Sequence, residues 1–161
     1  MSAKMPKLLE INLLDLGESE DKKIMQFLFG KKHNPQPFGS QFQIIDCLRA
    51  GLPKYTVNNI LDQTDIAKPQ LSSIIHMSYH QLNRHAEQDM LSVHQSSFLY
   101  EFARVYVRTS DIFGDSATAD SWLHRSNTAL GGKTPIELLD TIEGFRMVED
   151  LLLQIEYGAY S

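Results

Sequence analysis

The clearest helical signal in the chain is FLYEFARVYVRTSDIFG, residues 98–114. Its apolar side chains recur at steps of three and four residues, which places them on one face of a helix. They are Phe98, Leu99, Phe102, Val105, Tyr106, Ile112 and Phe113. Ser92 and Gln95 precede the run with the spacing of a capping box, and Gly114 can end it. The stretch therefore predicts one long helix with a defined start and end.

The sequence after this helix predicts three further helices. A short alanine-containing helix should end at Trp122-Leu123, and Gly131-Gly132 should form a turn. The segment Thr134-Pro135-Ile136-Glu137 combines a capping threonine, a proline at the first helical position and a glutamate three residues after the cap. This combination indicates the start of a helix. The last helix should stop at Gly158.

Residues 41–97 predict several short helices that are separated by glycine and proline. Two of them have helix-turn-helix spacing: one lies around Pro69–Ile75, and the other runs from Tyr79 to Ala86 after a break at His76-Met77-Ser78. No convincing strand pattern follows residue 40. The expected fold class is therefore all-α.

The second helix of this pair is a candidate DNA-recognition helix. Ser78 and Gln81 can form a capping box at its start. Glutamine and asparagine amides can read adenine, and arginine can read guanine or hold a phosphate. The candidate DNA-binding residues are Tyr79, His80, Gln81, Asn83 and Arg84. The alternative is an ordinary helical hairpin whose polar side chains face solvent.

The first 40 residues form a region to which the sequence assigns no function. Its end is marked by the polar segment 31–39, which contains two prolines and a glycine and cannot continue a helix. Within the region, Ser19 can cap a short helix that runs towards Phe29 and ends at Gly30. Residues 8–16 are apolar in near alternation and fit either a strand or an arm that contacts a partner.

Length and composition favour a soluble cytoplasmic protein. The chain has 161 residues, enough for a substantial core, and its one cysteine, Cys47, excludes an intramolecular disulfide. No apolar run reaches the roughly 20 residues that a membrane helix needs. The formal charge of −5 falls entirely in residues 98–161, which hold five basic and ten acidic side chains. A basic protein partner suits that half of the chain better than nucleic acid does.

The sequence favours neither catalysis nor metal or cofactor binding. No nucleophile stands beside a base in a recognisable arrangement. His76 and His80 are four residues apart, but a predicted helix start separates them, so they would not share a helical face. Gly132-Lys133-Thr134 resembles the end of a phosphate-binding loop, yet Asn127 stands where its first glycine is required.

The C-terminal half carries a long, ordered set of residues that points to a family. They are Phe113-Gly114-Asp115, Ala119, Trp122-Leu123, Asn127-Thr128-Ala129-Leu130-Gly131-Gly132-Lys133-Thr134-Pro135-Ile136-Glu137-Leu138-Leu139, Gly144, Val148, Glu149, Leu152 and Ile155-Glu156-Tyr157-Gly158. This set closely resembles the toxin-binding domain of Xre/MbcA/ParS-type antitoxins. Weaker similarity extends back to about residue 42 through Leu71, Met77-Ser78, Leu82 and Arg84. The sequence departs from the family at Ala67, where a capping serine is usual, and at His76, where a glycine is usual.

The resemblance implies an antitoxin of a type II toxin–antitoxin system and not an enzyme. Its partner would be a toxin that consumes NAD, with a NAD-degrading RES toxin favoured over a ParT-like ADP-ribosyltransferase. In such pairs the C-terminal segment of the antitoxin blocks the toxin's active site. This assigns toxin binding to the end of the chain, namely Glu156, Tyr157, Gly158, Ala159, Tyr160 and Ser161.

The resemblance also implies that the antitoxin represses its own operon by binding operator DNA. Residues 41–97 would form an Xre-like helix-turn-helix domain, and residues 98–161 the toxin-binding domain. One weakly cationic recognition helix offers few phosphate contacts, so we expect a homodimer, and a hetero-oligomer with the toxin. The alternative function is that of a stand-alone helix-turn-helix repressor with no toxin partner.

Overall fold

The computed structural model describes residues 19–30 and 41–158. Its helices are α2 (Glu20–Phe29), α3 (Gln41–Ala50), α4 (Tyr55–Gln63), α5 (Lys68–Ile74), α6 (Tyr79–Arg84), α7 (Val93–Phe113), α8 (Ser116–Leu123) and α9 (Ile142–Gly158), with 3-10 turns η2 (Thr128–Leu130) and η3 (Ile136–Leu138). Within these ranges the chain forms two isolated bridges and no strand, which confirms the all-α class. No described helix is long and apolar enough to cross a membrane.

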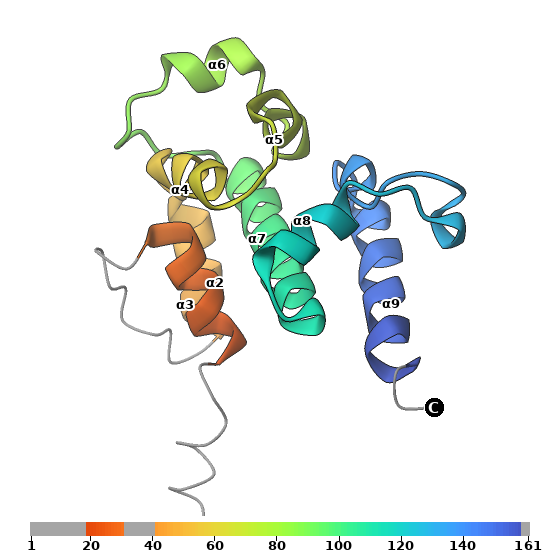
Figure 1. The fold of residues 1–161 in the computed structure, drawn as a ribbon. Helices are drawn as coiled ribbons and strands as arrows, with labels where there is room; N and C mark the ends of the chain where they lie inside the picture. The colour runs from red at the N-terminus through yellow and green to blue at the C-terminus, as the bar shows by residue number, and fades with distance from the viewer. Residues whose placement is uncertain (1–18, 31–40, 159–161) are drawn as a thin grey trace, which may run out of the picture.

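The long helix α7 is the centre of the fold, with α2, α3 and α4 on one side, α5 and α6 above its start and α9 on the other side (Figure 1). Ser92 and Gln95 form both hydrogen bonds of the predicted capping box, and Gly114 ends the helix in the left-handed conformation at φ 92°. Along α7, ten residues are buried, including Phe102 with no exposed surface. The sequence prediction for this helix is confirmed at both ends.

Helix α2 belongs to the core of the fold. Ser19 caps it as predicted, and Ile24 and Leu28 are fully buried. The Phe27 ring stacks on Tyr106 of α7 with centroids 5.0 Å apart. Asn59 and Gln63 of α4 donate side-chain hydrogen bonds to the carbonyls of Leu28 and Phe27, which have no partner inside the helix. Residues 20–29 are thus built into the helical body, whereas the predicted arm at residues 8–16 lies outside the described residues.

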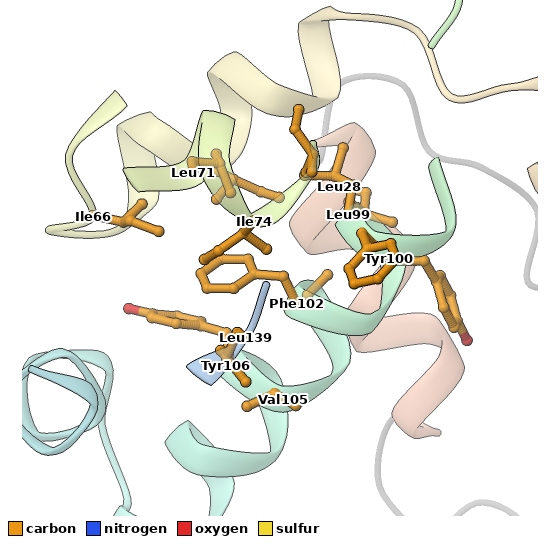
Figure 2. Close-up of a cluster of buried hydrophobic side chains, with 14 of the residues drawn as sticks. Leu28, Ile66, Leu71, Ile74, Leu99, Tyr100, Phe102, Val105, Tyr106 and Leu139 are labelled. Atoms are coloured by element: carbon orange, nitrogen blue, oxygen red, sulfur yellow. The ribbon is translucent and has the colours of Figure 1, made fainter. Parts of the chain in front are cut away.

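One hydrophobic core joins the helix-turn-helix region to the C-terminal region. Figure 2 shows Leu28 of α2 and Ile74 of α5 packed around Phe102 of α7, with Leu139 on the other side of the cluster. The predicted boundary between residues 97 and 98 falls inside α7, which begins at Val93. The two regions therefore meet along a shared helix, without a linker between them.

The helix predicted from Thr134 is only one 3-10 turn long. The capping contacts form, since Thr134 Oγ1 donates to Glu137 Oε2 at 2.8 Å, but η3 ends at Leu138. The true start of α9 is one turn later, where Thr141 Oγ1 accepts a hydrogen bond of 2.9 Å from the Gly144 N–H. A Cβ on Gly144 would lie 1.7 Å from the Leu138 carbonyl oxygen, so glycine allows the first turn of α9 to pack directly on η3.

Candidate functional site

The two helices predicted to form a helix-turn-helix are present as α5 and α6. Leu71 and Ile74 of α5 and Leu82 of α6 are buried and turn both helices onto the core. Ser78 Oγ accepts from the Gln81 N–H and Gln81 Oε1 accepts from the Ser78 N–H, each at 3.1 Å, which confirms the predicted capping box. Helix α6 ends at Arg84, two residues before the predicted end.

The two departures from the family pattern have different structural outcomes. Ala67 occupies the N-cap position of α5 and provides no side-chain hydrogen bond, so that helix start has lost one stabilising contact. His76 takes a φ of 57° and is the sole non-glycine residue with positive φ among those described. The turn therefore keeps the left-handed conformation that glycine usually provides, although histidine pays a conformational cost there.

The five candidate DNA-binding residues lie on α6 and are all exposed. Two of them already use the acceptor of their amide groups within the protein. Gln81 Oε1 accepts from the Ser78 N–H, and Asn83 Oδ1 accepts from Lys68 Nζ at 2.6 Å. Reading adenine requires both the donor and the acceptor of an amide, so these contacts would have to open on DNA. Arg84, exposed in the last turn of α6, is the strongest base-reading candidate.

Lys68 is a candidate DNA contact that the sequence analysis missed. Its ammonium group lies 5.7 Å from the centre of the Tyr79 ring as well as bonding to Asn83. These contacts hold the Lys68 ammonium group beside the exposed face of α6, where it could contact a phosphate of bound DNA. The signal was present in the sequence as the first residue of α5, but only the folded turn brings it next to α6.

Lys54 fixes the far end of α6. It is 7% exposed, and its Nζ donates to the carbonyl oxygen of His85 at 2.8 Å. His85 is the C-cap residue of α6, so a cation lies at the negative end of the helix dipole. A buried lysine that anchors a helix end could not be distinguished from a surface lysine in the sequence.

The candidate toxin-binding residues begin at the exposed end of α9. Glu156, Tyr157 and Gly158 are all exposed, and Tyr157 has 70% of its surface accessible. Phe145, Val148 and Leu152, in earlier turns of α9, are buried and fix the helix to the core. The remaining predicted residues, Ala159, Tyr160 and Ser161, lie outside the described residues.

A groove of about 360 Å³ lies between α7 and α9. Phe98 and Phe145 line it, and Ile142 lies at its side with 63% of its surface exposed. Arg104 of α7 bridges Glu101 of the same helix and Glu149 of α9, at 2.6 and 2.5 Å. Burial raises the pKa of Glu101, while the Arg104 guanidinium opposes that rise. The groove thus combines an apolar surface with a compact ion-pair network.

The buried carboxylate of Asp120 is held by structural partners. Asp120, 8% exposed, accepts hydrogen bonds from the Tyr106 hydroxyl at 3.0 Å and from the Asp65 N–H at 3.2 Å. Over the described ranges, no three histidine, cysteine, aspartate or glutamate residues cluster in a way that could hold a metal ion. The Gly131-Gly132 segment forms a closed turn, in which the Asn127 N–H donates to the Lys133 carbonyl at 3.0 Å.

The comparisons with known proteins find a family model and several antitoxins. Residues 109–158 match the family model described as the antitoxin Xre/MbcA/ParS C-terminal toxin-binding domain. An Antitoxin Xre of Pseudomonas putida is 34% identical over 68 residues, which cover 42% of this chain and 43% of the relative. The Prs ADP-ribosylating antitoxin of a Sphingobium strain is 34% identical over 85 residues, 47% of this chain and 54% of the relative.

A third relative matches more of the chain at lower identity. The Antitoxin Xre of Photorhabdus laumondii is 29% identical over 116 residues, which cover 71% of this chain and 78% of the relative. The chain spans only about half the length of the first two relatives. The similarity is therefore most specific in α8, the glycine turn and α9, where the family model lies.

Proposed function

We propose that the chain is an antitoxin of the Xre/MbcA/ParS family and that it neutralises a NAD-consuming toxin through the end of α9; the match of residues 109–158 to the toxin-binding domain of that family supports this. The observation that carries the proposal is the exposure of Glu156 and Tyr157 beyond the buried face of a firmly packed helix. An anchored helix can present its end to another protein without first being ordered, which lowers the cost of binding.

The chemistry of this end suits an active site that binds NAD. Such a site must hold a pyrophosphate, so it should be basic, and residues 98–161 carry a net charge of −5. The ring of Tyr157 offers an aromatic face of the kind that stacks in a nucleotide pocket. Exposed Glu156 next to it can pair with a basic side chain of the toxin.

We favour a RES toxin that degrades NAD as the partner. The Sphingobium relative carries ADP-ribosylation in its name, so a ParT-like ADP-ribosyltransferase is the second candidate. Both would present a NAD site to the antitoxin. Both reactions release nicotinamide from NAD, so the fate of the ADP-ribose part distinguishes them: a NAD-degrading toxin leaves it in solution, whereas an ADP-ribosyltransferase attaches it to a protein.

We also propose that the protein represses its own operon through α6, with Arg84 and Lys68 as the principal cations. The capping box of α6, its position next to α5 and the exposure of Arg84 support this role. The protein would bind a two-fold operator as a homodimer and assemble with the toxin into a hetero-oligomer. The alternative remains a repressor without a toxin, which would leave the growth of its host unchanged when the neighbouring gene is expressed alone.

The test is inhibition of the toxin by truncated forms of the antitoxin. NAD consumption by the purified toxin is titrated with the full chain, with a form lacking residues 157–161, and with a milder form lacking residues 159–161. We expect both truncations to lose inhibition, because the residues after Gly158 can then no longer enter the active site. Circular dichroism and a gel shift with operator DNA serve as controls for folding.

Single substitutions separate the two tyrosines. Tyr160→Ala and Tyr157→Ala should each weaken inhibition by about thirtyfold, the effect of losing a buried aromatic anchor of about 2 kcal/mol. If all truncated forms inhibit as well as the full chain, the end of α9 is not the inhibitory element. Inhibition would then have to come from the helical surface between Trp122 and Leu152.

A further inference from the structure

The turn of the helix-turn-helix is bonded directly to the start of α9. His76 Nε2 lies 2.7 Å from the carbonyl oxygen of Asp140, a residue 64 positions away in the sequence. Because a carbonyl only accepts, Nε2 must carry the proton of this bond. Both the Nε2–H tautomer and the protonated ring satisfy that requirement.

Ring contacts provide a second connection between the same two regions. The His76 ring lies 5.1 Å from the His94 ring and 4.7 Å from the Phe98 ring, the latter edge-on at 71°. Phe98 in turn lies 5.9 Å from Phe145 of α9. The turn and α9 are thus linked both through a hydrogen bond and through a row of packed rings.

Further contacts hold the backbone at both ends of this connection. On the side of α9, Asp140 precedes Thr141, which caps the helix, and Gly144 packs against the Leu138 carbonyl with no room for a Cβ. On the side of the turn, the Met77 N–H donates to the Ser72 carbonyl at 3.0 Å, and Ser78 then caps α6. The contact therefore joins the start of α9 to the start of α6 at two points that are each hydrogen-bonded to their own helix.

We propose that His76 couples the two binding surfaces, so that a partner bound to α9 changes the position of α6 and the affinity for operator DNA. This inference rests on the proposed function, since it needs a partner at each surface. It assigns a role to the residue that occupies the strained position of the turn. A glycine there would relieve the strain but could not reach Asp140.

The experiment compares three substitutions in the full chain. His76→Gly and His76→Asn both tolerate positive φ, and neither residue reaches Asp140, so both remove the hydrogen bond. His76→Gly also adds backbone freedom to the turn, whereas His76→Asn does not. His76→Gln keeps a side-chain N–H donor at comparable reach and serves as the rescue variant. Thermal unfolding shows whether each variant is folded.

The first measurement needs neither toxin nor DNA. Hydrogen exchange of the free protein should be faster in His76→Gly and His76→Asn than in the natural chain, both at residues 76–82 and at residues 140–146. His76→Gln should stay close to the natural chain. Faster exchange confined to the turn would show that the bond does not connect the two regions, and would overturn the proposal independently of any function.

The second measurement is the coupling itself. Operator affinity is measured with and without saturating toxin, and the ratio of the two dissociation constants is compared among the variants. We expect a ratio that differs from one by about fivefold or more in the natural chain, approaches one in His76→Gly and His76→Asn, and is largely restored in His76→Gln. A ratio of one in the natural chain, or an unchanged ratio in His76→Gly, would overturn the coupling. A natural chain that binds no operator would contradict the proposed repressor function. The hydrogen-exchange result would still test whether the His76–Asp140 bond connects the turn to α9.

Discussion

The hydroxyl group of Tyr106 on α7 donates a hydrogen bond of 3.0 Å to Oδ2 of Asp120 on α8. Oδ1 of the same carboxylate accepts from the Asp65 N–H in the loop between α4 and α5. One buried carboxylate therefore holds together three segments that are far apart in sequence. Burial and the neighbouring charge of Asp120 raise the pKa of Tyr106, so that its hydroxyl remains a donor throughout the physiological range.

Tyr106→Phe should destabilise the protein by about 1–2 kcal/mol, because it removes the hydroxyl donor while keeping the ring stacked on Phe27. Asp120→Ala should cost more, since it leaves both the hydroxyl and the Asp65 N–H without their partner. Urea unfolding measures the free energy of unfolding of both variants. Equal stability of Tyr106→Phe and the natural chain would show that the bond contributes nothing net.

Gly144→Ala should destabilise the protein by about 3 kcal/mol or more, because the added methyl group would collide with the Leu138 carbonyl. The matched control is Gly158→Ala on the same helix, where an added Cβ meets nothing within 4 Å. We expect that substitution to leave the thermal unfolding temperature unchanged or slightly raised. If the two variants unfolded alike, the close approach of η3 to α9 would be incorrect.

Glu101→Gln should change how stability depends on pH. Burial raises the pKa of Glu101 in the folded state above the usual 4.5. At pH values between the unfolded pKa and the raised folded pKa, the folded protein therefore binds more protons than the unfolded chain. Stability from this group therefore falls as the pH rises through that window, and the substitution removes the fall. Urea unfolding across the mildly acidic range measures it, with the exposed Glu143→Gln as control.

Arg84→Ala and Lys68→Ala should weaken operator binding in different ways. A guanine-reading Arg84 contributes about 1–3 kcal/mol and gives sequence preference, whereas a phosphate contact by Lys68 lowers the salt slope of binding by about one. Gel shifts at several salt concentrations, with cognate and scrambled DNA, separate these effects. Toxin inhibition should remain normal in both variants, and normal operator binding in both would move the DNA surface away from α6.

The free protein should be a dimer at micromolar concentration, since two recognition helices are needed for useful affinity to a two-fold operator. Light scattering of the free protein and of its complex with the toxin measures the mass directly. A strict monomer in both states contradicts this prediction.

Sequence reasoning succeeded where a local signal decides the structure. The capping boxes at Ser78 and Ser92 and the helix end at Gly114 each depend on residues within four positions of one another. It failed where a distant contact decides. The cap at Thr134 forms as predicted, but the helix predicted from it ends after one 3-10 turn at Leu138, and the last helix, α9, begins separately at Ile142. The position of Lys68 beside Tyr79 likewise arises only when the turn has folded.

The shared helix α7 has a consequence for how such proteins can recombine. A cut at the predicted boundary between residues 97 and 98 would pass through a helix whose buried residues belong to one core. Exchanging operator specificity between relatives would therefore require the matching face of α7, including Leu99 and Phe102, to move together with α4 to α6. Chimaeras joined at Ser92 that ignore this face should fold poorly, and a new pairing of operator and toxin would have to arise through substitutions within the intact body.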